Sequence, residues 1–263
     1  MSKLEVDAIE PQSGTTITIG ASGDTINLVG TLQGNGSPLP GDISSVVAGT
    51  GLSGGGTSGA VTLNSDLLAK QAGTNFTNSL LVGTSSTGTL NDANSNTGVG
   101  IGVLAALTSG DRNTVVGFQA GKDNTTGGEN SFFGRLAGCE NTTGGANTGI
   151  GSASINSNTT GGCNTAIGHS ALETNTTASN NVAVGYRAAG SNTTGAENTA
   201  VGTCALLANT TGANNVGIGE RAICTNTTGN CNVSVGYKAL GANTTASQNV
   251  AVGSCALLAN TTG

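Results

Sequence analysis

The chain has 263 residues, of which 45 are glycine, 2% are aromatic and 8% are charged, and its formal net charge is −6. The negative charge argues against nucleic acid and anionic membrane surfaces as partners. No apolar run approaches the roughly 20 residues that a membrane-spanning helix needs, and the first residues, MSKLEVDAIEPQ, lack the apolar core of a signal peptide. We therefore expect a protein made in a cytoplasm and not exported by the general secretory route.

The first 89 residues predict two short β-rich segments. Residues 1–40 contain all three prolines and the alternating runs TTITIG and DTINLVG, which predict strands joined by glycine turns. Residues 41–89 carry the runs ISSVVAG, AVTLNSD and SLLVG between tracts of Gly, Ser and Thr. We interpret residues 1–40 as an N-terminal segment and residues 41–89 as a spacer.

The spacer also contains GTGLSG at residues 49–54, which matches the pattern G-x-G-x-x-G of dinucleotide-binding proteins. Such a site requires a helix directly after the glycines, because the helix N-terminus binds the phosphates. Here the chain continues GGTSGAVTLN, which predicts another strand. We therefore expect no phosphate site and no cofactor.

From residue 90 onward the chain is a repeat of 17 residues without insertion or deletion. The tripeptide Asn-Thr-Thr opens at Asn124 and returns every 17 residues up to Asn260, and the same frame begins at Leu90 and Leu107. Ten complete repeats and a four-residue stub fill residues 90–263. Because the chain stops inside a repeat, we expect a further C-terminal part beyond Gly263.

Three positions of the repeat, counted from the Asn of Asn-Thr-Thr, are nearly constant. Position 7 is always Asn: Asn96, Asn113, Asn130, Asn147, Asn164, Asn181, Asn198, Asn215, Asn232 and Asn249. Position 10 is always apolar: Val99, Val116, Phe133, Ile150, Ile167, Val184, Val201, Ile218, Val235 and Val252. Position 11 is always Gly: Gly100, Gly117, Gly134, Gly151, Gly168, Gly185, Gly202, Gly219, Gly236 and Gly253.

This pattern predicts an all-β fold, a parallel β-solenoid or β-roll with one coil per repeat. Positions 8 to 10 predict a short strand with position 10 as the core row, and the glycine at position 11 permits a turn. Positions 13 to 15 predict a second strand, and Asn-Thr-Thr-Gly predicts the return turn. The asparagines at position 7 then lie above one another and form a hydrogen-bonded ladder. A helix is excluded because Gly, Asn and Thr fill the interior of every candidate segment.

The core of such a coil is thin. Each coil offers about three modest apolar side chains, worth roughly 1.5–3 kcal/mol each on burial, against a backbone entropy cost of about 1–2 kcal/mol per residue. Small residues at positions 9 and 14 allow chains to approach closely. We therefore expect an interlocked oligomer, with a homotrimer as the simplest arrangement.

The six cysteines do not suggest a disulfide framework. Same-position pairs are Cys139 and Cys224, Cys163 and Cys231, and Cys204 and Cys255. Even three coils separate such a pair by roughly 14 Å at a strand spacing of about 4.8 Å, whereas a disulfide needs Cα atoms within about 7 Å. The pairing of Cys224 with Cys231 stays open. Because no metal-ligand spacing is present, we expect reduced thiols and no metal.

Two resemblances add to this pattern. NTAIGHSA, NNVAVGYRA and NTAVGTCA resemble head repeats of trimeric autotransporter adhesins, which form a trimeric left-handed β-roll, although their coils are usually shorter than 17 residues. MSKLEVDAIEPQSGTTITIGASGDTINLVGTLQGNG resembles the N-terminal segment of tail-fibre proteins of marine tailed (cyanobacterial-type) phages, and GDISSVVAGTGLSGGGTSGAVTLNSD resembles a spacer in the same proteins. That resemblance implies that residues 1–40 attach to a virion tail or baseplate protein and that a C-terminal tip binds the host surface.

Other residues suggest weaker functional alternatives. His169, the only histidine, shares position 12 with Phe118, Tyr186 and Tyr237, which predicts an exposed row and not a catalytic triad. These aromatic residues provide a possible contact for glycans. Glu129 and Glu197 share position 6 but lie four repeats apart, so no catalytic carboxylate pair is expected. The Asn-x-Thr triplets match glycosylation acceptors, but without a secretory signal they are interpreted as turns.

The threonine row at position 2 provides a different alternative: Thr125, Thr142, Thr159, Thr176, Thr193, Thr210, Thr227 and Thr244. Regular threonine rows on solenoids resemble ice-binding faces. The favoured hypothesis is a non-enzymatic structural component of a virus tail fibre, located in the virion. An extracellular adhesin or filament protein is the first alternative, and an ice-binding solenoid is the second.

Overall fold

The computed structural model describes residues 75–83 and 87–261, and the backbone of six short strands between residues 33 and 73. The chain divides into two compact units, residues 1–49 with 53–63 and residues 50–52 with 64–263. β1 (Gln33–Gly34) pairs antiparallel with β2 (Ser37–Pro38). The runs TTITIG and DTINLVG lie outside the described residues.

A second small sheet has the strand order β3-β4-β5. It contains β3 (Val46–Val47), β4 (Leu52–Gly56) and β5 (Leu63–Ser65). The predicted runs ISSVVAG and AVTLNSD contain β3 and β5, respectively. Gly54, the last glycine of GTGLSG, lies within β4, so the end of the pattern is part of a strand and not of a helix.

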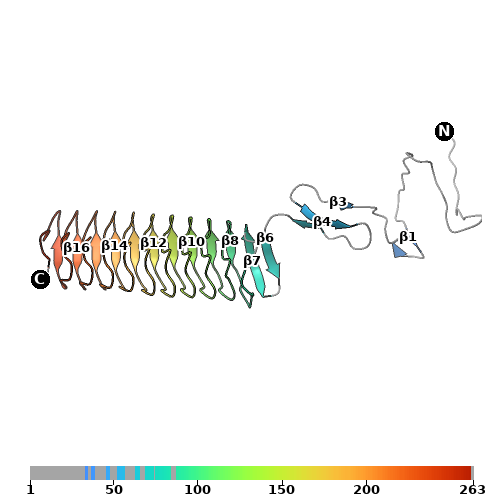
Figure 1. Ribbon diagram of the computed structural model, residues 1–263, viewed down its shortest axis with the longest axis horizontal. Coiled ribbons are helices and arrows are strands. Elements are labelled where there is room, and N and C mark those ends of the chain that lie inside the picture. The colour runs from blue at the N-terminus through green and yellow to red at the C-terminus, as the bar shows by residue number, and fades with distance from the viewer. Residues whose placement is uncertain are drawn as a thin grey trace, which may run out of the picture. The chain divides into compact units, whose positions relative to one another are not determined.

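The repeats form a parallel β-solenoid with one strand in each coil (Figure 1). The strands are β8 (Thr97–Val99), β9 (Thr114–Val116), β10 (Ser131–Phe133), β11 (Thr148–Ile150), β12 (Thr165–Ile167), β13 (Val182–Val184), β14 (Thr199–Val201), β15 (Val216–Ile218), β16 (Val233–Val235) and β17 (Val250–Val252). Each strand pairs in parallel with the residues 17 positions away, as in Thr148↔Thr165. The described residues contain no helix. The predicted solenoid of ten 17-residue coils is confirmed.

The sheet begins before the first predicted repeat. β7 (Phe76–Val82) pairs in parallel with β8, with Leu80 opposite Thr97, so the 17-residue spacing continues backwards. β6 (Ala69–Gly73) then pairs antiparallel with β7 and ends the twelve-stranded sheet. The predicted boundary at residue 90 therefore does not coincide with the end of the sheet.

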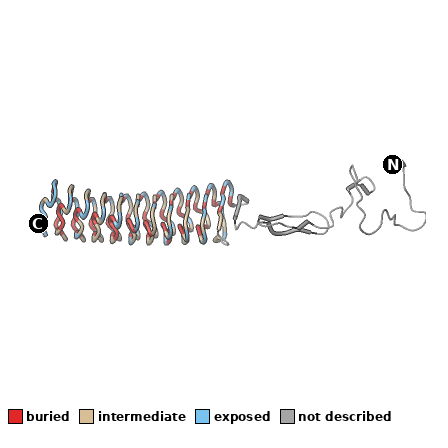
Figure 2. Tube along the Cα trace, turned by 90° about the horizontal axis from the view of Figure 1, so that it is seen from above, coloured by how far each residue is buried: buried red, intermediate tan, exposed pale blue. Residues whose placement is uncertain are grey.

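The core lies at positions 9, 14 and 15, and not at position 10 as the sequence predicted. Buried examples are Ala166 at position 9, Ala171 at position 14 and Leu172 at position 15. Buried residues recur in successive coils along the stack (Figure 2). Because strand side chains alternate between faces, burying position 9 turns positions 8 and 10 outward. The predicted core row from Val99 to Val252 is wrong: none of its ten members is buried, and Ile150 is 42% exposed.

The narrow coil interior explains why the larger side chains are outside. A Cβ added to Gly149 at position 9 would lie 2.9 Å from a methyl group of Ile155. Conversely, Phe132 fills position 9 of the preceding coil, and a Cβ on Gly138 would lie 2.5 Å from its ring. A large residue on one wall is therefore matched by glycine on the other, and a row of Val and Ile does not fit beside Leu at position 15.

The predicted second strand at positions 13 to 15 is also wrong, because these residues form turns. Positions 13 and 15 have left-handed backbone conformations, even at the β-branched Ile155 (φ 47°) and Ile223 (φ 46°). Such φ values are uncommon outside glycine. They recur here because they aim backbone amides along the stack: the Ile155 amide donates to the Ala171 carbonyl at 2.8 Å.

The turn glycines at position 11 lie where the sequence predicts them. Their φ angles run from 123° at Gly253 to 145° at Gly134. A Cβ on Gly151 would lie 2.5 Å from the carbonyl oxygen of Gly168 in the next coil. Both the backbone conformation and the close approach of neighbouring coils therefore require glycine.

Candidate functional site

The asparagines at position 7 form a buried ladder that joins every coil to the next, as expected from the spacing. In each of the nine steps from Asn96 to Asn249 the backbone amide donates to the side-chain oxygen one coil earlier, at 2.9–3.0 Å. The side-chain amide of Asn164 also donates to the Ala178 carbonyl at 2.8 Å. The buried amide groups are thus satisfied along the stack, as burial of polar groups requires.

A second asparagine ladder runs along position 1, which the sequence analysis interpreted only as a turn. Its side chains are buried, and the Asn158 amide donates both to the Asn141 side-chain oxygen at 2.6 Å and to the Gly161 carbonyl at 2.9 Å. The same two bonds recur for Asn192 and Asn209. The invariant Asn in nine consecutive repeats was the signal for this ladder.

The threonine row at position 2 is bound to the next coil and does not form a free hydroxyl face. The Thr125 hydroxyl donates to the Thr142 carbonyl at 3.0 Å. The backbone amides of Thr125, Thr126 and Gly127 donate to that same oxygen at 2.9–3.3 Å. The Asn-Thr-Thr-Gly segment therefore stabilises the stack, and each position 2 hydroxyl from Thr125 to Thr244 donates its proton to the next coil. The threonines at position 3 are exposed but lie in the turn.

The outer face of the parallel sheet, made by positions 8 and 10, is an exposed, largely apolar surface. Several residues of row 10 are at least one-third exposed, among them Phe133, Ile150, Ile167 and Ile218. None of the twenty residues at these positions in β8–β17 is charged. Such a surface buries apolar area when another molecule covers it, and it is the strongest candidate functional site in the described chain.

The aromatic residues at position 12 are exposed, as the sequence predicts. The His169 and Tyr186 rings stack with centroids 5.6 Å apart, and the Lys238 ammonium lies 5.0 Å from the Tyr237 ring centroid. No acid–base partner that would make a catalytic triad contacts His169 in the described residues. The row is a surface feature of the coils.

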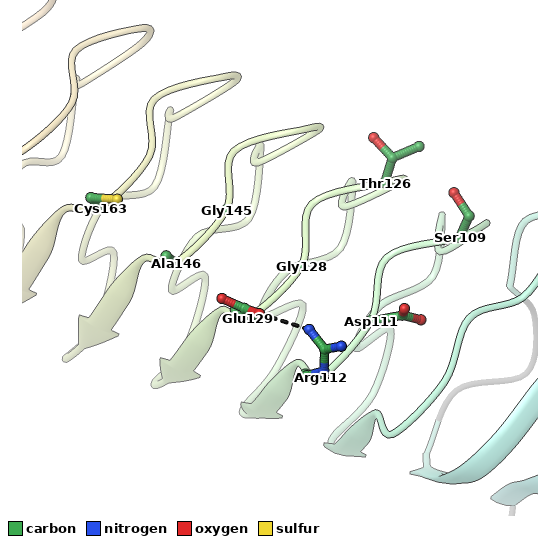
Figure 3. A pocket seen from close by; sticks show the side chains of 9 residues that line it. All are labelled: Ser109, Asp111, Arg112, Thr126, Gly128, Glu129, Gly145, Ala146 and Cys163. Atoms are coloured by element: carbon green, nitrogen blue, oxygen red, sulfur yellow. Dashed lines mark hydrogen bonds and ion pairs between the residues drawn. The ribbon is translucent and has the colours of Figure 1, made fainter.

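A groove runs along positions 3, 5 and 6 near the N-terminal end of the array (Figure 3). Its volume is about 460 Å³, and its lining residues are Ser109, Asp111, Arg112, Thr126, Gly128, Glu129, Gly145, Ala146 and Cys163. Arg112 Nη1 lies 2.7 Å from Glu129 Oε1. Because both side chains are largely exposed, this pair contributes little stability. Glu129 therefore faces a guanidinium and not a second carboxylate.

The groove is hollow at Gly128 and Gly145, where position 5 has no side chain. Elsewhere an Asn, Asp or Ser at position 5 accepts a hydrogen bond from the position 5 amide of the preceding coil. The Ala213 amide donates to Asn230 Oδ1 at 2.7 Å, and the Gly162 amide donates to Ser179 Oγ at 3.0 Å. Gly145 offers no such acceptor to Gly128, whose amide donates no hydrogen bond within the described residues.

All six cysteines are free thiols, including Cys224 and Cys231, whose pairing the sequence left open. Cys139 is buried, and burial raises the pKa of its thiol; the Asp123 and Glu140 carboxylates act in the same direction, whereas Lys122 opposes them. Within the described residues, no three His, Cys, Asp or Glu side chains are grouped to hold a metal ion. A search of the same residues finds no helix with the length and apolarity to cross a membrane.

Comparison with known proteins gives no matching family model, no matching curated protein and no matching solved structure.

Proposed function

We propose that this chain is a structural component of a virus tail fibre, in which the solenoid forms a rigid homotrimeric shaft. In this proposal residues 1–40 attach to a virion tail or baseplate protein, and a C-terminal part contacts the host surface. The protein is made in the host cytoplasm, assembles into the virion, and acts mechanically without catalysis.

The observation that supports this function is the continuous bonding between coils. The position 7 ladder joins successive coils from Asn96 to Asn249, the position 1 ladder joins those from Asn124 to Asn243, and the strand pairing runs from β7 to β17 without interruption. Such a stack resists bending and local opening, because each coil is held along its main chain and its interior side chains. At about 4.8 Å per coil, ten coils give a length of roughly 50 Å. These properties suit a spacer that transmits force.

The attachment test uses phage particles from a host that produces this chain. Gold-labelled antibody raised against residues 90–263 is expected to decorate the tail fibres in electron micrographs. Deletion of residues 1–40 is expected to remove the label from particles while the chain still accumulates in the lysate. Labelled particles after that deletion would contradict the proposed anchor, and label on bacterial cell surfaces alone would favour the adhesin alternative.

A further inference from the structure

We infer that the outer face of the parallel sheet, positions 8 and 10 of β8–β17, is the surface through which copies of this chain associate. This inference rests on the proposed function only in taking the partner to be the same chain. Row 10 of this surface was predicted to form the core, whereas row 8 was predicted only as part of the strand.

The face contains no charged residue. Row 10 presents only Val, Ile and Phe to the outside, and row 8 presents only Thr, Ser and Val. Charged residues occur at positions 3, 5, 6, 12, 13, 16 and 17, as in Asp92, Asp111, Arg112, Glu220, Arg221, Glu173 and Asp123. A face that excludes charge over ten coils, while other surfaces carry it, matches the charge-depleted centre of a protein interface.

The size of the face limits the area that association can bury. Rows 8 and 10 lie about 7 Å apart along the strand, and ten coils extend roughly 48 Å. With side-chain width included, the face covers about 600 Å², at the upper end of apolar patches on monomers. If the face of each copy is covered, about 1,200 Å² is buried for two copies and about 1,800 Å² for the proposed three, against a lower limit of about 1,200 Å² for a stable specific interface. The face is therefore large enough for self-association only when most coils take part.

The periodicity of the face indicates which molecule covers it. The exposed side chains recur with the strand spacing of the sheet in perfect register, as the pairs Ile150↔Ile167 and Val184↔Val201 show. A second copy presents rows with the same spacing, so each row meets matching side chains along the whole length. A partner of another fold matches such a periodic face at only a few points. The same chain is accordingly the occupant that covers the face completely.

The two halves of the face differ in polarity. Row 8 carries Thr or Ser from Thr97 to Thr165, but Val at Val182, Val216, Val233 and Val250. Association is therefore expected to be stronger through the C-terminal coils, and this difference favours parallel alignment of the copies.

The test measures the mass of the undenatured protein by light scattering against the chain mass of 25.2 kDa. The face variant Ile150→Lys/Ile167→Lys places two charges on row 10. The matched control Thr143→Lys/Thr160→Lys places the same charges in the same two coils, at exposed position 3. The wild type and the control are expected to be oligomeric. The face variant is expected to dissociate at least about a hundredfold more readily, because like charges then oppose each other across the interface.

Circular dichroism establishes that the variants keep the sheet. If the lysine variant does not fold, Ile150→Thr/Ile167→Thr retains β-branched residues, and at least about a tenfold weaker association is expected. An oligomeric wild type with unchanged association of the folded face variants would overturn the assignment of the face, while leaving the homotrimer intact. A monomeric wild type would overturn both the assignment of the face and the homotrimer. Ice shaping by that monomer would indicate that the face binds ice.

Discussion

At the scale of single residues, Gly151 and its equivalents at position 11 set the distance between coils. Their carbonyl groups face the Cα of the preceding glycine so closely that no side chain fits between them. Asn164 and its equivalents at position 7 have a complementary role, because each satisfies backbone groups that the tight stack would otherwise leave unpaired. Backbone spacing and polar satisfaction therefore depend on two different residue types.

Gly151→Ala is expected to lower the free energy of unfolding by about 1–3 kcal/mol, because alanine strains the φ of 132° and contacts the Gly168 carbonyl. The control is Gly162→Ala at position 5, where Ala196 and Ala213 occur naturally. Denaturant titration compares the two variants. Equal stability of both would show that position 11 does not require glycine.

Asn164→Ala is expected to cost about 2–3 kcal/mol, because the Asn181 amide loses its acceptor in a buried site. Asn156→Ala, at the less buried position 16, removes an Asn outside both ladders and is expected to change stability by less than about 0.5 kcal/mol. Thermal unfolding of the two variants under identical conditions measures the difference. A loss no greater than that of the control would argue against the ladder as a source of stability.

At the scale of elements, the strand and its following turn show what the sequence specifies. The 17-residue period and the Gly at position 11 predict the coil, and the Asn at position 7 predicts one ladder. These predictions are possible because the turn requires glycine and the ladder requires asparagine at a fixed position in every repeat. The core row was not predictable in the same way. Because side chains alternate along a strand, positions 9 and 10 face opposite sides. The residue types, such as Ala166 and Ile167, do not indicate which of the two sides is buried.

Two further features were hidden for physical reasons. The left-handed residues Ile155 and Ile223 contradict their intrinsic preference, since bonds to the next coil override it. The exposed face of rows 8 and 10 was not predicted, because row 10, which includes Ile150, was expected to lie in the core. The hydrogen bond from a position 5 amide to the position 5 side chain of the next coil was not predicted, because position 5 varies among Asn, Asp, Gly, Ser and Ala.

The position 5 cap gives a prediction for this element. Gly145→Asn is expected to raise the free energy of unfolding by about 0.5–1.5 kcal/mol, because the new side chain accepts from the Gly128 amide as Asn230 does from Ala213. Gly145→Ala is the control, because it lowers the conformational entropy of the unfolded chain as Asn does but adds no hydrogen bond. Chemical denaturation is the measurement, and equal effects of Asn and Ala would show that the cap adds nothing.

At the scale of the whole array, register matters more than the number of coils. Removing residues 158–174 deletes one complete repeat and joins Ser157 to Asn175, so both ladders continue. We expect this protein to fold, with the array shortened by about 4.8 Å. Small-angle scattering and circular dichroism measure length and sheet content.

The matched control removes residues 158–173, one residue fewer. It shifts every later coil by one position, which moves the inner side chains outward and breaks both asparagine ladders. We expect loss of sheet signal for the C-terminal coils. Equal folding of both deletions would show that the ladders do not fix the register.

The constant register also shapes how such a gene changes. Each strand of the array pairs only with its neighbours in chain order, and every coil corresponds to a whole number of codons. Unequal recombination between two repeats therefore adds or removes complete coils in frame, and each product retains all of its inter-coil bonds. A single genetic step of this kind changes the length of the array by whole coils, whereas a change in the chemistry of a face requires substitutions within individual repeats.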